Sequence, residues 1–359
     1  MSLFKVVILP HGFPSTDSEQ QIIRQAGGWV VDGDQLPSEA AALREAEDAE
    51  AILVRWTPLT PEHIRRFRCC RIIVRYGIGY DNVDYEAATA AGILIGHCTD
   101  YCVDEVATHA LALLLACVRD VAATHQRVAA GGWNVTPPVR QRRLAGSTLG
   151  LVGLGNIGRA VARKLGGWNL RLLALDPYVP PEQAAELGVE LVDLPTLCHE
   201  SDYVSMHAPL LPETRHLIGR RELASMKPGV MLINTARGPL VDEAALAESL
   251  ASGHVAAAGL DVFETEPLAP GSPLREHPRV IVSDHAAWYS EDSLKELKKS
   301  VGEEAVRACT GGLPIAIANP EVLHKLGRFH EWRPNYNAQW RARRAALASQ
   351  CGVPPCPSP

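Results

Sequence analysis

The chain has 359 residues, 47% of them hydrophobic and 21% charged, which favours a folded protein of two domains. Its formal charge of −6 excludes a domain-wide basic surface, so nucleic acid is not expected as a direct partner. No stretch reaches the roughly 18 apolar residues of a membrane helix, and the apolar run 6–9 is too short for a signal peptide. The nine cysteines show no zinc-binding spacing, so we expect no metal site, no membrane partner and a cytoplasmic location.

Short apolar runs alternate with helical patterns over the first hundred residues. This strand–helix alternation predicts a parallel sheet with helices on both faces. Strands are expected at 4–9, 29–31, 51–54, 71–74 and 93–95, and helices at 18–26, 38–46, 61–67 and 84–91. A single long apolar helix is then expected over 103–130, ending near Gly131-Gly132, as a bridge between two lobes.

The alternation restarts at residue 148, which predicts a second doubly wound unit. A charged helix over about 290–310 should then return the chain to the first lobe. Further strands are expected at 171–175, 203–206, 230–233, 256–260 and 280–283.

A glycine-rich turn follows the first strand of the second unit. Gly153-x-Gly155-x-x-Gly158 opens a helix that is expected from Asn156 to about Leu165. The first glycine permits the tight turn, the second lets a pyrophosphate approach the backbone, and the third lets the helix pack on the strand. The helix N-terminus then faces the anion. This context predicts a dinucleotide site; a strand–turn–helix without a ligand is the alternative.

The strand at 171–175 ends at Asp176, about where the acid that binds the ribose should lie. A carboxylate there accepts hydrogen bonds from the ribose hydroxyls and repels a 2′-phosphate, so NAD is predicted rather than NADP. Asp176 could instead be a turn residue before Pro177.

The expected fold is therefore α/β with two doubly wound parallel-sheet domains. A discontinuous, flavodoxin-like substrate domain takes residues 1–100 and 288–330, and a Rossmann NAD-binding domain takes residues 101–287. The basic and Pro-rich tail, residues 331–359, is expected to be poorly ordered.

Three further strands of the second unit end in polar groups. Arg237 follows one, Asp261 and Glu266 follow the next, and His285 follows the last. Ligands of open α/β sheets sit beyond the carboxyl ends of the strands, so these groups can converge.

Reduction of a 2-oxo acid needs this set of groups. An arginine orients the carboxylate and polarises the carbonyl, and a histidine gives the proton. A carboxylate beside the histidine fixes its tautomer. We assign these roles to Arg237, His285 and Glu266. Alternatively, Arg237 caps a turn, Glu264 is the histidine's partner, or His285 is a core residue.

Several motifs carry a family resemblance. R-Y-G-I-G-Y-D-N-V-D (75–84), G-L-V-G-L-G-N-I-G, M-K-P-G-V-M-L-I-N-T-A-R-G-P-L-V-D and G-L-D-V-F-E-T-E-P resemble the D-isomer-specific 2-hydroxyacid dehydrogenase family over roughly residues 3–320. H-A-A-W-Y-S-E further resembles the branch that contains the C-terminal binding proteins, which are NAD(H)-binding corepressors.

The resemblance implies that Arg237, Glu266 and His285 are the catalytic set, and that the chain forms a homodimer. The cofactor site is expected to comprise Gly153, Gly155, Asn156, Ile157, Gly158, Asp176, His207, Ala208, Pro209, Thr214, Thr235, Ala236, Arg237, Asp261, His285 and Val106, with Thr108 near the nicotinamide. For the substrate, the resemblance implies that the Ile78–Gly79 N–H groups bind the carboxylate and that Arg75 lines the same cleft.

Two departures from the family pattern bear on the substrate. Asp284 stands where many members have proline, and could face His285 or solvent. The arginine of the phosphoglycerate dehydrogenase pattern, Arg-Ser-x-Thr, is displaced by one position to Arg55, which argues against 3-phosphoglycerate. Arg55, Trp56 and Trp288 predict a partly aromatic substrate pocket, although Trp288 could be ordinary core packing.

The predicted function is NAD-dependent hydride transfer between a 2-oxo acid and a D-2-hydroxy acid. The alternative is an NAD(H)-responsive, corepressor-like scaffold with weak dehydrogenase activity. A formate-type reaction is less favoured because the related formate enzymes carry glutamine where this chain has Glu266.

Overall fold

The computed structural model describes residues 3–133 and 142–328, which divide into two compact units. Unit 1 contains described residues 3–102 and 290–328, and unit 2 contains described residues 103–133 and 142–289. The chain passes from one unit to the other after Cys102 and again after Tyr289. The predicted tail, residues 331–359, lies outside the described residues.

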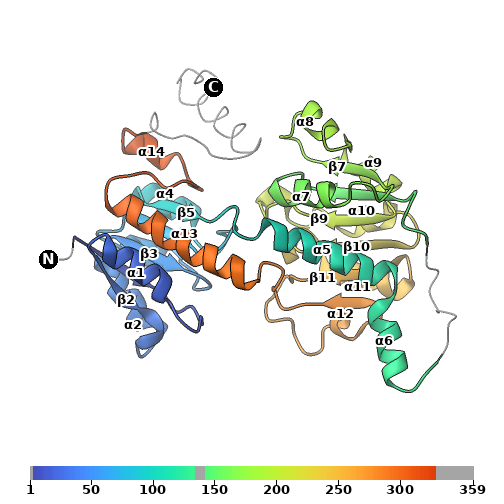
Figure 1. Ribbon diagram of the computed structural model, residues 1–359, viewed down its shortest axis with the longest axis horizontal. Helices are drawn as coiled ribbons and strands as arrows, with labels where there is room; N and C mark the ends of the chain where they lie inside the picture. The colour runs from blue at the N-terminus through green and yellow to red at the C-terminus, as the bar shows by residue number, and fades with distance from the viewer. Residues whose placement is uncertain (1–2, 134–141, 329–359) are drawn as a thin grey trace. The chain divides into compact units, whose positions relative to one another are not determined.

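Unit 1 is built on a five-stranded sheet in the order β2-β1-β3-β4-β5, with all neighbours parallel (Figure 1). This is the flavodoxin-like strand order. The strands are runs of branched apolar residues, mostly buried because helices cover a parallel sheet on both faces. They are β1 (Phe4–Ile8), β2 (Gly28–Asp32), β3 (Ala51–Val54), β4 (Ile72–Arg75) and β5 (Leu94–His97).

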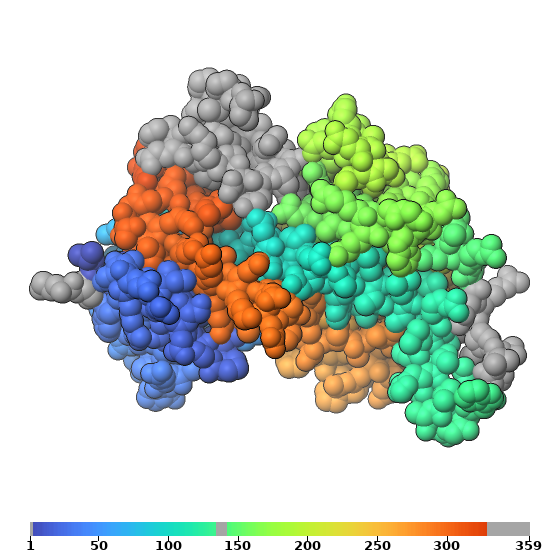
Figure 2. Space-filling model, in the orientation of Figure 1, coloured from blue at the N-terminus to red at the C-terminus, as the bar shows by residue number. Residues whose placement is uncertain are grey.

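The helices of unit 1 come from both parts of the chain. Figure 2 shows the surface of α13 beside that of α1, and the two helices approach closely at Gly302, where an added Cβ would lie 3.2 Å from the Cα of Glu19. The helices are α1 (Asp17–Gln25), α2 (Glu39–Glu45), α3 (Pro61–Arg66), α4 (Tyr85–Ala91), α13 (Glu291–Cys309) and α14 (Val322–Lys325), with short 3-10 turns η1 (Gly33–Gln35) and η2 (Ala46–Asp48).

Unit 2 is built on a seven-stranded sheet in the order β12-β11-β10-β9-β6-β7-β8, again with parallel neighbours. Counted from its own first strand, the order is that of a Rossmann fold extended by one strand, so the predicted fold class is confirmed. The strands are β6 (Thr148–Val152), β7 (Arg171–Leu175), β8 (Val189–Leu191), β9 (Tyr203–Met206), β10 (Val230–Asn234), β11 (Val255–Leu260) and β12 (Val280–Val282).

The helices of unit 2 connect these strands. α11, for example, is capped at its N-terminus by Asp242, whose carboxylate accepts the Ala245 N–H, and at its C-terminus by the left-handed Gly253. The helices are α5 (Val103–Val118), α6 (Val121–Ala129), α7 (Asn156–Lys164), α8 (Pro181–Ala185), α9 (Leu194–Glu200), α10 (Arg220–Ser225), α11 (Glu243–Ser252) and α12 (Pro273–Glu276), with 3-10 turns η3 (Pro212–Thr214) and η4 (Gly238–Leu240).

The prediction of one helix over 103–130 is wrong. α5 ends at Val118, and α6 starts at Val121 after a bend of 61°. Asp120 between them has φ 51°, a left-handed conformation that ends the helical path and that aspartate tolerates better than most residues. In the described part of the chain, no single helix has the length and apolar composition to cross a membrane; α5 and α6 meet that measure only when joined across their bend.

Candidate active site

The glycine-rich loop of unit 2 leaves no room for side chains at its outer glycines. Gly153 has φ 99°, and a Cβ there would lie 2.7 Å from the backbone of His207 and Ala208. A Cβ at Gly158 would lie 2.3 Å from the carbonyl oxygen of Gly153. α7 starts at Asn156 directly after Gly155, so its N-terminus opens on this loop, and Ile157 lies in its first turn.

The loop lies where the strand order of unit 2 reverses. β6 and β9 are neighbours at this point, and His207 follows β9. Ligands of such sheets bind beyond the strand ends at this switch point. Burial lowers the pKa of His207 to about 4, so its ring is neutral at pH 7 and pairs with Ser205 at 2.9 Å. Thr214, in η3, donates its hydroxyl hydrogen to the Pro209 carbonyl at 2.7 Å and thereby holds the next turn.

Asp176 is buried at the end of β7 and is bonded to the same loop. One carboxylate oxygen accepts the Leu154 N–H at 2.8 Å, and the other accepts the Tyr178 N–H at 3.0 Å. The carboxylate therefore lies against the glycine-rich loop, as the ribose-binding interpretation requires.

A buried hydroxyl after β10 also bears on ligand binding. Thr235 follows β10, and its Oγ1 is buried without a hydrogen-bond partner in the described chain. A buried hydroxyl left unpaired costs roughly 1–3 kcal/mol, so such an atom calls for an explanation. The glycine cradle, Asp176 and this hydroxyl together fit a bound dinucleotide. Ala236, next to Thr235, is half-buried, and Val106, on α5, is buried.

The three predicted catalytic residues follow three adjacent strands. β10, β11 and β12 are parallel neighbours, and Arg237, Glu266 and His285 lie in the turns after them. The first two turns pack directly together, since a Cβ at Gly238 would lie 1.9 Å from the carbonyl carbon of Phe263. The guanidinium of Arg237 donates to the Ala236 carbonyl at 2.7 Å.

His285 and Glu266 form a hydrogen-bonded pair. The ring Nδ1 of His285 lies 2.8 Å from Oε2 of Glu266, and Oε1 of Glu266 accepts the Phe263 N–H at 3.0 Å. Burial favours a higher pKa for Glu266, but His285, the Phe263 N–H and the charge of Arg237 together bring that pKa below its ordinary value. Glu266 is therefore a carboxylate at neutral pH.

The alternative partner, Glu264, is engaged elsewhere. Its Oε1 lies 3.1 Å from Nε2 of His216 and accepts the Glu243 N–H at 3.0 Å. The structure thus pairs His285 with Glu266 and not with Glu264. Asp284, before the histidine, is exposed to solvent. Trp288 is half-buried and meets Tyr289 edge to face, with ring centroids 5.5 Å apart.

The predicted substrate residues of unit 1 form their own group at the carboxyl ends of β3 and β4. The guanidinium carbon of Arg55 lies 4.1 Å from the centroid of the Phe13 ring and 4.9 Å from that of Trp56. That of Arg75 lies 5.8 Å from the Trp56 ring. Two guanidinium groups therefore contact one indole that is 46% exposed.

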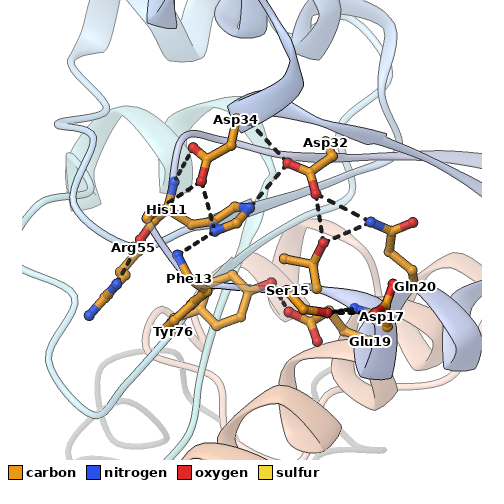
Figure 3. Close-up of polar contacts among 12 residues, drawn as sticks. His11, Phe13, Ser15, Asp17, Glu19, Gln20, Asp32, Asp34, Arg55 and Tyr76 are labelled. Carbon is orange, nitrogen blue, oxygen red and sulfur yellow. Dashed lines mark hydrogen bonds and ion pairs between the residues drawn. The ribbon is translucent and has the colours of Figure 1, made fainter.

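A buried histidine, which sequence reasoning missed, fixes the loop beneath this group. His11 lies between Asp32 and Asp34, with its Nε2 3.1 Å from the first carboxylate and its Nδ1 3.2 Å from the second (Figure 3). The His11 carbonyl accepts a hydrogen bond from Arg55 at 2.6 Å. The sequence did contain a signal for these contacts: His11 follows β1, and Asp32 and Asp34 stand at the end of the neighbouring strand β2.

The Ile78–Gly79 segment follows β4. The Ile78 carbonyl pairs with Nδ1 of His97 at 2.7 Å. Gly77 before it has φ 141°, and its missing side chain gives space to the Arg75 guanidinium, which a Cβ would approach to 1.6 Å. The segment that precedes Ile78 thus needs glycine.

Unit 2 is a Rossmann domain whose switch point carries a dinucleotide-binding loop, and whose adjacent strand ends carry an arginine, a carboxylate and a histidine. These features define a dinucleotide-binding class of protein. Comparison with known protein families identifies the family within this class. Residues 111–287 match the NAD-binding domain model of the D-isomer-specific 2-hydroxyacid dehydrogenases.

Individual proteins and solved structures that resemble this chain support the same family. The glyoxylate reductase of Korarchaeum cryptofilum is 38% identical over 291 residues, which cover 80% of this chain and 88% of that protein. The D-3-phosphoglycerate dehydrogenase of Mycobacterium bovis is 40% identical over 315 residues, which cover 87% of this chain and 58% of that one. The structure of an Aquifex aeolicus D-lactate dehydrogenase with NAD and lactic acid matches with a TM-score of 0.76 at 28% identity, covering 88% of this chain and 99% of that one.

The chain belongs to the D-isomer-specific 2-hydroxyacid dehydrogenase family, and its cofactor is NAD. It spans little more than half the length of the mycobacterial phosphoglycerate dehydrogenases that it matches, at 58% of the M. bovis protein. The relatives named here are a reductase and two dehydrogenases, so the resemblance to the corepressor branch stays a prediction.

Proposed function

We propose that the protein is an NAD-dependent oxidoreductase that interconverts a 2-oxo acid and a D-2-hydroxy acid. The observation that carries this proposal is the 2.8 Å pair between His285, which follows β12, and Glu266, which follows β11. Arg237 follows β10, the neighbour of β11. The pair supplies a proton carrier, and the arginine supplies a fixed positive charge.

The cofactor would be held by unit 2. The N–H groups of the 153–158 loop and the N-terminus of α7 would bind the pyrophosphate, and Asp176 would accept bonds from the ribose hydroxyls. The Thr235 hydroxyl would gain the partner that it lacks. When bound, NADH supplies the hydride that reduces the carbonyl carbon of the substrate.

The proposed roles of the three catalytic residues follow from their contacts. Glu266 is ionised and can only accept, so Nδ1 of His285 carries the hydrogen of their bond. The other ring nitrogen, Nε2, is then the atom that gives a proton to the carbonyl oxygen during reduction and takes it back during oxidation. Arg237 would bind the substrate carboxylate and polarise the carbonyl.

We further propose that the group on unit 1 selects the substrate. The Ile78 and Gly79 N–H groups and Arg75 would bind the carboxylate, while Arg55 and Trp56 would contact the rest of the molecule. Two guanidinium groups against one indole suit a side chain that is planar, anionic or both. In unit 2, we keep Trp288 as a further proposed substrate contact.

A substrate panel tests the proposal. Purified protein is mixed with NADH and each of glyoxylate, pyruvate, a phosphorylated 2-oxo acid and phenylpyruvate, and loss of NADH absorbance is followed. We expect turnover of at least one acid, and a loss of at least about 100-fold in kcat for His285→Ala with little change in NADH affinity. Turnover in His285→Ala equal to that of the unchanged protein would refute the assigned role.

The corepressor-like scaffold is the second candidate, favoured by the H-A-A-W-Y-S-E stretch. It predicts tight NADH binding with negligible turnover across the same panel. The family resemblance also leads us to propose a homodimer and a cytoplasmic location; light scattering on the purified protein measures the first.

A further inference from the structure

The turn that carries His285 is held by one buried carboxylate. Asp261 follows β11 and is 1% exposed. Its Oδ1 accepts the Ser283 hydroxyl at 2.6 Å and the Ala286 N–H at 2.9 Å, and its Oδ2 accepts the Ala287 N–H at 3.0 Å. The backbone carbonyl of Asp261 accepts the His285 N–H at 2.9 Å. Residues on both sides of His285 therefore bond to a single side chain.

This turn holds His285 in an unfavourable backbone conformation. Its φ is 57°, in the left-handed region that is unfavourable for a residue with a Cβ atom. The conformation persists only where surrounding contacts fix it. Here these contacts are the bonds to Asp261, and they direct the ring so that Nδ1 meets Glu266.

The network extends one residue further, to His109 on α5. Ser283 has one hydroxyl hydrogen, and it goes to the Asp261 carboxylate, which can only accept. The Ser283 oxygen lies 3.0 Å from Nε2 of His109, so that nitrogen must be the donor. His109 thus donates to Ser283, and Ser283 donates to Asp261. Nε2 of His109 is also 3.6 Å from Oδ1 of Asp261, where a positive ring would attract the carboxylate.

We infer that His109 and Ser283 are positioning residues for His285. They act through Asp261: their hydrogen bonds fix the orientation of its carboxylate, and the carboxylate fixes the left-handed turn and the ring. This inference deepens the proposed function and depends on it for its kinetic test. The signals in the sequence were weak, since they amount to a histidine within a largely apolar helix and a serine two residues before His285.

The kinetic test uses matched pairs of variants. Ser283→Ala removes the hydroxyl and Ser283→Thr keeps it; His109→Leu removes the N–H donor, and His109→Gln keeps one near the place of Nε2. His125→Leu, at an exposed position of α6, is the control. Rates are measured in single turnovers, so that product release does not mask the reduction step. We expect Ser283→Ala and His109→Leu to lower the rate of reduction about 10–100-fold, with KM and NADH affinity nearly unchanged. The conservative variants, Ser283→Thr and His109→Gln, should keep most of the rate of the unchanged protein.

A second readout does not depend on turnover. Proton–nitrogen NMR of the histidine rings, without substrate, should show an Nδ1–H signal of His285 that is assigned by its absence in His285→Ala. We expect that signal to be lost or averaged in Ser283→Ala and His109→Leu and kept in Ser283→Thr. Should one variant fail to fold, the other decides.

The two possible failures are distinguishable. If the unchanged protein reduces no 2-oxo acid, the proposed function fails, and the ring signal alone decides the positioning role. If the protein is active and His285→Ala is not, while both Ser283→Ala and His109→Leu keep the full rate and the ring signal, the positioning inference is overturned and the proposed function stands.

Discussion

Glu266 keeps a negative charge next to the ring that would carry the proton. Its ionised state depends on His285, the Phe263 N–H and Arg237, because burial favours the neutral form. An imidazolium formed at His285 would therefore be stabilised by a charge 2.8 Å away.

Glu266→Gln tests this charge without changing the shape of the side chain. An amide oxygen can still accept from Nδ1, but it does not attract an imidazolium. We expect kcat for reduction to fall about 10–100-fold, with KM nearly constant. Glu264→Gln, two positions earlier, is the matched control and should leave kcat almost unchanged, since Glu264 pairs with His216. If Glu264→Gln lowered kcat more than Glu266→Gln did, Glu264 would be the carboxylate that stabilises the imidazolium.

Asp176 should set the choice between the two nicotinamide cofactors. Its carboxylate lies against the glycine-rich loop, where a 2′-phosphate would be repelled. Asp176→Asn removes the charge and keeps one oxygen acceptor for the loop. We expect the ratio of kcat/KM for NADPH to that for NADH to rise at least about tenfold. An unchanged ratio would mean that Asp176 only holds the turn.

At the scale of elements, most strands could be predicted from runs of branched apolar residues. The strands of unit 1 were predictable because Val, Ile and Leu fill them on both faces. β8 was missed because Val189–Leu191 is short and alternates with charge. The break between α5 and α6 was missed because neither glycine nor proline marks it, and the left-handed conformation falls on Asp120.

Part of the candidate site was also predictable from the sequence, and part was not. Arg237, Glu266 and His285 were predictable because each follows an apolar run, and parallel strands bring their carboxyl ends to one edge. The His109–Ser283–Asp261 hydrogen bonds and the contacts of His11 with Asp32 and Asp34 were not, because they join segments distant in sequence. A local pattern shows at most that polar residues stand in these segments, and not which of them pair.

α13 contains a buried carboxylate that should make the stability of unit 1 depend on pH. Glu304 is 4% exposed and accepts the Ile315 N–H at 2.8 Å; burial raises its pKa to about 7. A folded pKa above the unfolded value means that its contribution is fully present below about pH 4.5 and is lost as the pH rises through about 7. Ionisation therefore weakens the folded state.

Glu304→Gln removes this titration and can still accept the Ile315 N–H. We expect the variant to be more stable than the unchanged protein at pH 8, by at most about 2–3 kcal/mol, and equally stable near pH 4.5. Urea unfolding at the two pH values measures the difference. Glu303→Gln, on the neighbouring and more exposed position, should show no such pH dependence; equal effects of Glu304→Gln at both values would contradict the assignment.

At the scale of the whole molecule, each unit has apolar cores of its own. One core in unit 1 gathers around β1, β3 and β4, and two in unit 2 cover the faces of its sheet. The proposed cofactor residues all belong to unit 2. Binding should therefore stabilise one unit and leave the other nearly unaffected.

Calorimetry tests this separation. We expect two unfolding transitions, of which NADH at 100 times its dissociation constant stabilises only one, by about 2.7 kcal/mol. NADPH at the same concentration should give a smaller shift because its 2′-phosphate would meet Asp176. A single transition that moves as a whole would show that the two units unfold together.

The two chain crossings, after Cys102 and after Tyr289, have a consequence for biosynthesis. The part of unit 1 that precedes Cys102 emerges from the ribosome without α13, the helix that packs along α1 and contacts β3 and β4. Unit 2, by contrast, follows as one stretch between the crossings and can finish folding as soon as it is made. Unit 1 is therefore completed after unit 2, and until translation has passed Cys309, the last residue of α13, the nascent α1 lacks the helix that packs against it.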